Sequence, residues 1–135
     1  MRTKTQVRVR YADTDAAGIV HYARYLAYLE AARADALRTV GLSSEMIAIC
    51  SVQTWLVQAV LRYRAPARFD DLLDVYAWVV DAANSQFRFA YEIQRPADQV
   101  LIGTSETLHT WADRQSHASI NSPDWLQAAL NQLRA

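Results

Sequence analysis

The chain has 135 residues, of which 52% are hydrophobic and 21% charged, and this is the size and composition of one folded domain spanning residues 1–135. Fourteen Lys and Arg balance fourteen Asp and Glu, which excludes the basic surface that nucleic acid requires. No apolar run is long enough for a signal peptide or a membrane span, and a single cysteine excludes an internal disulfide. Together these features predict a cytoplasmic protein.

The first third of the chain changes from a strand pattern to a helix pattern. Residues 6–11 alternate polar and apolar and predict a strand that ends at Tyr11. A small, acidic loop follows over residues 12–18, and a period near 3.6 then predicts one long helix over residues 19–40, ended by Gly41. The apolar stripe of this helix contains Tyr22, Tyr25, Leu26, Leu29, Ala32, Ala36, Leu37 and Val40.

The rest of the chain is dominated by strand patterns. A short helix capped by Ser43 or Ser44 comes first. Four strands in a meander are then expected over residues 54–65, 72–82, 86–95 and 100–112. One face of the first of these is expected to carry Trp55, Val57, Ala59, Leu61 and Tyr63. A short terminal helix closes the chain, with Ser122 as its N-cap and Pro123 as its first residue.

A long helix followed by a run of strands is typical of an α+β fold. The helix is apolar around much of its girth, so the most economical way to bury it is inside the concave side of a curved sheet. The sequence therefore predicts a five-stranded antiparallel sheet wrapped around one long helix, which is the hotdog fold, with a short C-terminal helix.

Two carboxylates, Asp13 and Asp15, stand just before the predicted helix. The first N–H groups of a helix lack internal partners, so an aspartate at this place can simply cap them. The same N–H groups can polarise a carbonyl whose oxygen becomes negative in a transition state, and Gly18 leaves room for a substrate to approach the backbone. A carboxylate that is ionised at neutral pH could then attack an acyl carbon or deprotonate water. Spacing alone leaves capping and catalysis both open.

Other polar and aromatic residues near the helix also have two interpretations. His21 is either a surface histidine or a hydrogen-bond donor to substrate, and Glu30 is either a solvated charge or an acid that orients water. Tyr22, Tyr25 and Tyr28 are either core or interface residues or ligand contacts. Cys50 is interpreted as a packing residue.

Three features of the sequence exclude other chemistries. The histidines are too scattered for metal-ligand spacing, three glycines cannot form a phosphate-binding loop, and no Ser-His-Asp or Cys-His arrangement stands out. We therefore expect neither a metal nor a cofactor.

The stretch "DTDAAGIVHYARYLAYLEAAR" resembles the signature of the 4-hydroxybenzoyl-CoA thioesterase family, and especially its Tol-Pal-associated acyl-CoA thioesterase branch. The later stretch "YRAPARFDDLLDV" is also typical of that family, and the resemblance covers nearly the whole chain. It implies hydrolysis of an acyl-CoA thioester to a free acid and coenzyme A. It also implies an obligate homodimer with a continuous sheet and interfacial active sites, often paired further into a homotetramer.

The resemblance also implies roles for individual residues. The second acid of the motif is the catalytic one, and it falls on Asp15; the backbone N–H that polarises the thioester carbonyl falls on Tyr22. Gly18 matches the family glycine, and Glu30 matches an acid of the Tol-Pal branch. We expect Gly18, His21, Tyr25 and Glu30 to contact substrate.

The chain departs from the family in two places. The Tol-Pal branch usually has Tyr-His where this chain has His21-Tyr22, so a histidine role at the second position does not carry over. The basic cluster that the hydroxybenzoyl type carries at the turn is absent around Asn84. The candidates for holding the CoA phosphates are Arg62, Arg64, Arg68, Arg88 and Arg114. The alternative functions are a non-catalytic acyl-CoA or acyl-carrier binding module and a hotdog dehydratase.

Overall fold

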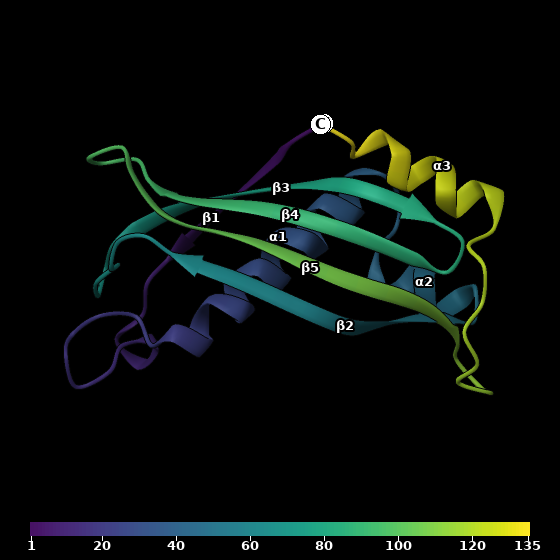
Figure 1. Ribbon diagram of the computed structural model, residues 1–135, viewed down its shortest axis with the longest axis horizontal. Coiled ribbons are helices and arrows are strands. Elements are labelled where there is room, and N and C mark those ends of the chain that lie inside the picture. Colours follow the sequence, from purple (N-terminus) through teal and green to yellow (C-terminus); the bar gives the residue numbers. More distant parts are fainter.

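The computed structural model describes all residues from 1 to 135 (Figure 1). In chain order its elements are β1 (Thr3–Arg8), the 3-10 helices η1 (Tyr11–Asp13) and η2 (Tyr22–Arg24), α1 (Tyr25–Thr39), α2 (Ser44–Ile49), β2 (Val52–Tyr63), β3 (Leu72–Ala83), β4 (Gln86–Arg95), β5 (Val100–Asp113) and α3 (Asp124–Gln132). None of the helices has the length and apolar character needed to cross a membrane.

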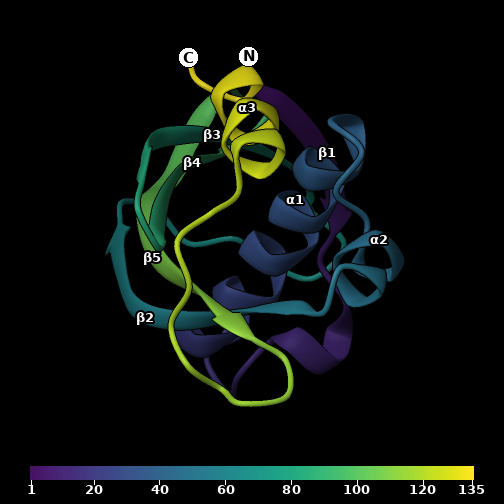
Figure 2. The ribbon, with the colours of Figure 1, turned by 90° about the vertical axis from the view of Figure 1, so that its right-hand side faces the viewer.

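The five strands form one antiparallel sheet in the order β1-β3-β4-β5-β2. The sheet curves around α1, and α3 lies beside one end of the sheet, near both chain termini (Figure 2). The predicted hotdog fold is therefore confirmed. The predicted four-strand meander is only partly right, because β2 pairs with β5 and not with β3. The connection from β2 to β3 crosses the sheet and leaves β2 as a free edge.

The central helix begins later than predicted. Residues 19–21 belong to the loop, and regular α-helix starts at Tyr25. The helix ends as expected: the Leu42 N–H donates to the Leu37 carbonyl at 2.9 Å, with Gly41 at φ +83°. The late start has a consequence for the predicted stripe, because Tyr22 lies before the helix and is 67% exposed.

Most of the predicted helix stripe is buried against the concave face of the sheet. The buried residues of α1 are Tyr25, Tyr28, Leu29, Ala32, Ala36 and Leu37. Leu26 was expected among them but is 40% exposed, whereas Tyr28, which lies outside the predicted stripe, is 5% exposed, in agreement with its interpretation as a core or interface residue. Tyr28 is buried because its hydroxyl has a polar partner inside the protein, which a pattern of apolar residues cannot reveal.

The first strand also lies earlier than predicted. It spans Thr3–Arg8, and Tyr11 belongs to η1, where its side chain is 78% exposed. The alternation of polar and apolar residues continues beyond Arg8, but the backbone turns there to make the loop that leads to the helix.

A β-bulge changes the predicted face of β2. The register shifts between Leu56 and Gln58, so Val57 has no partner in β5. Because the extra residue reverses the alternation, Trp55 pairs with Thr110 on the outer face, whereas Ala59 pairs with Thr107 on the inner face. The expectation that Trp55 shares a face with Ala59 is wrong for this reason.

The two short helices differ in how well their caps were predicted. The Ser43 hydroxyl accepts from the Met46 N–H at 3.1 Å, as a cap should. In α3 the N-cap is Pro123 and not Ser122. The Ser122 hydroxyl instead donates to the Asn84 carbonyl at 2.7 Å, which ties the segment before α3 to the β3–β4 turn.

Candidate active site

Asp15 is the first residue of the tight turn at the end of a loop formed by residues 14–20. The loop is closed by a bridge between Thr14 and Val20, and the Asp15 N–H donates to the Ile19 carbonyl at 2.9 Å. Gly18, at φ +78°, takes a backbone conformation that other residues rarely adopt. Gly18 therefore shapes the turn that presents Asp15.

The Asp15 side chain is exposed, and only one of its carboxylate oxygens is engaged. Oδ1 accepts from the Ala17 N–H at 2.9 Å, whereas Oδ2 has no partner in the protein. The carboxylate does not cap the helix start, because that role belongs to His21, whose Nδ1 accepts from the Ala23 N–H at 3.2 Å. Capping of α1 by Asp15 is thus contradicted by the geometry.

Asp13 has the opposite environment. It is 1% exposed, its Oδ1 pairs with Arg10 Nη2 at 2.9 Å, and its Oδ2 accepts from the Tyr28 hydroxyl at 2.7 Å. Burial alone would raise the pKa of the Asp13 carboxyl, but the hydrogen bonds from Arg10 and Tyr28 outweigh it and lower the pKa to about 2. Burial and the same hydrogen bond raise the pKa of the Tyr28 hydroxyl. Asp13 is an ionised anchor between the loop and the helix.

The loop is also attached to the connection between β2 and β3. The Val20 N–H donates to the Ala67 carbonyl at 2.8 Å, and Ile19 forms a bridge with Arg68. Two segments almost 50 residues apart in the sequence are therefore held together at the start of the helix.

These contacts bring Asp15 into one open cleft with Tyr22 and Tyr25. The cleft has a volume of about 430 Å³ and is also lined by Tyr63 and Arg64. The backbone N–H of Tyr22 donates to no acceptor in the protein, although its neighbours on both sides do. The residue with the free carboxylate oxygen and the residue with the free backbone donor thus line the same cleft.

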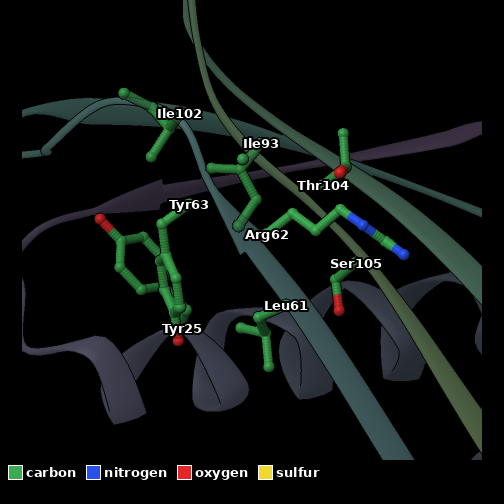
Figure 3. Close-up of a pocket in the computed structure, with 9 residues that line it drawn as sticks. Tyr25, Leu61, Arg62, Tyr63, Ile93, Ile102, Thr104 and Ser105 are labelled. Carbon is green, nitrogen blue, oxygen red and sulfur yellow. The ribbon is translucent and has the colours of Figure 1, made fainter.

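Tyr63 is the cleft residue that sequence reasoning missed. Its ring lies beside that of Tyr25, with centroids 5.6 Å apart (Figure 3). Behind the two rings a small cavity of about 10 Å³ is lined by Leu61, Ile93 and Ile102 among others. This cavity is too small to hold an acyl chain, and Tyr25 and Tyr63 line both it and the cleft. In the sequence Tyr63 is one residue of an alternating strand pattern, and nothing in that pattern indicates that it lines a cleft.

The remaining predicted contact residues lie around the cleft at different distances from it. His21 lines an adjoining hollow that Asp15 also lines, and Gly18 stays within the loop. Glu30 lies elsewhere, in a hollow of about 230 Å³ with Arg33 and Thr54. Within one chain the structure does not bring Glu30 and Asp15 together.

His109 is the one strongly shifted histidine, and it lies away from the cleft. It is 2% exposed and stacks on Phe87, with its Nε2 2.8 Å from the Thr107 hydroxyl. Burial, followed by the nearby charge of Arg33, lowers the pKa of His109 to about 3. The ring is neutral at physiological pH and packs under the sheet.

The fold and the cleft together define a hotdog protein whose candidate chemistry lies between a loop carboxylate and the start of the central helix. Residues 9–130 match the Thioesterase-like superfamily. The chain is 33% identical to the acyl-CoA thioester hydrolase YbgC of Escherichia coli O6:H1 over 107 residues, which cover 79% of each sequence.

Two solved structures resemble this chain along nearly its whole length. One is the hypothetical protein TT1821 of Thermus thermophilus, with a TM-score of 0.90, 32% identity and coverage of 100% of this chain and 99% of that one. The other is Slr0204, a 1,4-dihydroxy-2-naphthoyl-CoA thioesterase of Synechocystis, with a TM-score of 0.88, 26% identity and 98% coverage of both chains. The chain therefore belongs to the thioesterase-like superfamily, and it is a thioester hydrolase, as predicted.

Proposed function

We propose that this protein hydrolyses an acyl-CoA thioester to a free acid and coenzyme A, with Asp15 and the Tyr22 N–H as its catalytic groups. One observation carries the proposal: Asp15, which has a free carboxylate oxygen, and Tyr22, which has an unpartnered N–H, line the same cleft. The motif around Asp15 supports a finer assignment, which we also propose, to the 4-hydroxybenzoyl-CoA thioesterase family, close to the Tol-Pal-associated branch.

In this mechanism the Tyr22 N–H donates a hydrogen bond to the thioester oxygen and so stabilises the negative charge that develops there. Asp15 then acts by one of two routes. In the first, its oxygen attacks the carbonyl carbon, the C–S bond breaks, and water hydrolyses the resulting mixed anhydride. In the second, Asp15 takes a proton from water, which attacks the carbon directly, and the sulfur leaves with a proton. Both routes consume one water and need no cofactor.

The cleft also constrains the acyl group. Three tyrosines, Tyr22, Tyr25 and Tyr63, line the cleft, and the cavity behind Tyr25 and Tyr63 has a volume of only about 10 Å³. A flat or short acyl group fits this aromatic cleft better than a long alkyl chain, which would need a deeper cavity. The relatives named for acyl-CoA and for 1,4-dihydroxy-2-naphthoyl-CoA fall within this range.

Among the arginines considered for the CoA phosphates, Arg64 is the one placed in the cleft with Asp15. It is exposed and has no carboxylate partner, whereas Arg88 is paired with Asp81 and Glu106 on the outer face of the sheet. The side chain of Arg62 extends away from the tyrosine rings (Figure 3). We assign the phosphate end of the substrate to Arg64.

The active unit in this proposal is a dimer that pairs through β2. This strand is a free edge of the sheet, and Trp55, Leu56 and Val57 on it are 43%, 53% and 52% exposed. An unpaired apolar edge is a template for a second copy of the same strand. Two dimers associating further would give the homotetramer.

Antiparallel pairing over the whole length of β2 has a consequence for Glu30. It places the start of one β2 beside the end of the other. Because Thr54 lines the Glu30 hollow and Tyr63 lines the cleft, the hollow of one protomer then faces the cleft of its partner. Glu30 would reach the substrate across the interface.

The proposal is tested by measuring thiol release from acetyl-, hexanoyl-, 4-hydroxybenzoyl- and 1,4-dihydroxy-2-naphthoyl-CoA. We expect Asp15→Asn to lower kcat by at least about 100-fold, because the nucleophile or base is lost. Asp81→Asn, which changes an exposed aspartate on the outer face, is the matched control and should retain wild-type turnover.

Full turnover in Asp15→Asn would remove Asp15 from the mechanism. If the wild-type protein cleaves none of the four thioesters but binds coenzyme A in a calorimeter, the non-catalytic binding module replaces the hydrolase.

A further inference from the structure

Two peptide bonds meet at Tyr22, and three of their four polar groups are engaged. The His21 carbonyl accepts from the Arg24 N–H at 2.9 Å. The Ala23 N–H donates to His21 Nδ1 at 3.2 Å. The Tyr22 carbonyl accepts from the Tyr63 hydroxyl at 2.8 Å. The fourth group, the Tyr22 N–H, is free, and Tyr22 is one of the residues that line the cleft.

Of these three hydrogen bonds, only the one from Tyr63 comes from outside the turn itself. Tyr63 is the last residue of β2 and lies 41 positions away in the sequence. Its ring is 52% exposed in the cleft and is held at an angle against Tyr25. The end of the sheet is thereby joined to the start of the helix, at the residue that presents the free N–H.

From this arrangement we infer that Tyr63 is a positioning residue for the Tyr22 N–H. This inference rests on the proposed function, in which that N–H polarises the thioester carbonyl. A backbone donor stabilises a transition state only if its direction is fixed before the charge develops. The Tyr63 hydroxyl holds the Tyr22–Ala23 peptide from the side of the sheet, and His21 holds the same peptide from the side of the turn.

The position of the hydroxyl excludes a direct chemical role for Tyr63. It donates its proton to a carbonyl, and burial raises the pKa of its phenol above the ordinary value. It is therefore neither a base nor an acid at neutral pH. Its effect on the reaction is transmitted through the Tyr22 backbone.

The test compares Tyr63→Phe with Tyr11→Phe. Tyr63→Phe removes one hydroxyl and keeps the ring that lines the cleft, so we expect kcat to fall about 10-fold while KM stays within about twofold. Tyr11→Phe is the matched control, because its exposed hydroxyl has no hydrogen-bond partner, and it should retain wild-type kcat. The melting temperature of Tyr63→Phe should fall by no more than about 4 °C.

A second measurement does not depend on catalysis. Hydrogen exchange of the Ala23 amide, followed by NMR, should be at least about fivefold faster in Tyr63→Phe than in wild type, because the peptide is then held on one side only. An unchanged kcat or an unchanged exchange rate would each overturn the inference. Full turnover in Asp15→Asn would instead refute the mechanism proposed above, and the exchange result would still decide whether Tyr63 holds the peptide.

The hydrogen bond from the Ala23 N–H to His21 can be tested with one substitution that keeps an acceptor at this position and one that removes it. Asn retains an acceptor at a helix N-cap and Ala does not. We expect His21→Asn to retain at least about half of the wild-type kcat, whereas His21→Ala loses about 10-fold. Equal losses in the two variants would contradict a positioning role for the His21 acceptor and with it the two-sided support of the peptide.

Discussion

Asp13 and Asp15 are separated by one residue, yet the protein uses them in opposite ways. Asp13 is enclosed by Arg10 and Tyr28, whereas Asp15 points into an open cleft with one oxygen free. Spacing alone left their roles open, since both are acids before a helix, and only the family resemblance implied that Asp15 is the catalytic one. What separates them is the partner of each side chain, and Tyr28, fifteen positions from Asp13, could not be assigned to it from spacing.

The Asp13 anchor leads to a prediction about pH and stability. Because the pKa of Asp13 is lowered to about 2 in the folded protein, its contribution is complete above its ordinary pKa and is lost as the pH falls from about 4 to 2. Asp13→Asn removes the charge from these hydrogen bonds, so the free energy of unfolding at pH 7 should fall by about 2 kcal/mol. The loss should be much smaller at pH 2. Urea titrations at the two pH values measure both differences.

The control for this prediction is Asp81→Asn, whose carboxylate is exposed and should change stability little. A stability difference between wild type and Asp13→Asn that is the same at pH 2 and pH 7 would contradict the assignment of the low pKa to Asp13.

At the scale of elements, the sequence predicted which helices and strands exist better than it predicted where they begin and end or which of their side chains share a face. The long helix, its end at Gly41 and the strands β3, β4 and β5 follow from strong local patterns. The start of α1 and the face of Trp55 do not, since the first depends on the Ala67 contact with the loop and the second on a bulge at Val57. A contact between residues that are distant in the sequence leaves no periodic signal along the chain. One extra residue in the pairing of two strands leaves none either.

One close approach between β2 and β5 gives a prediction about the sheet. A Cβ atom on Gly103 would lie 2.6 Å from the backbone carbonyl oxygen of Arg62, which cannot move without disturbing the ladder. Gly103→Ala should therefore destabilise the protein by about 1–3 kcal/mol. Thermal unfolding should show a lower melting temperature for this variant, while Thr104→Ala, one position along the same strand, stays close to wild type. A wild-type melting temperature for Gly103→Ala would mean that the two strands are not so close.

At the scale of the whole molecule, the single chain leaves its largest apolar edge uncovered. The proposed pairing of two β2 strands would cover it and bring Glu30 to the cleft of the partner. The sequence resemblance implied an interfacial site, but only the structure separates the residues that meet within one chain from Glu30, which does not.

This pairing is tested by placing a charge in the middle of the edge. Val57→Lys should give a monomer in light scattering and lower turnover at least about 10-fold, because a buried, unpaired charge opposes association. Leu101→Lys changes an exposed apolar residue of the inner strand β5 and should leave the mass and the activity unchanged. A dimeric Val57→Lys, or a fully active monomer, would be incompatible with the interfacial site.

The small cavity behind Tyr25 and Tyr63 has a consequence for how such a protein could evolve. Most of the residues that line the cleft, among them Tyr22, Tyr63 and Arg64, are exposed and lie outside the hydrophobic core, whereas Val20 and Tyr25 belong to both. A substitution at the rim of the cleft would then alter the preferred substrate without opening a void in the interior. New substrate preferences are thereby accessible to this fold at little expense in stability, one surface residue at a time.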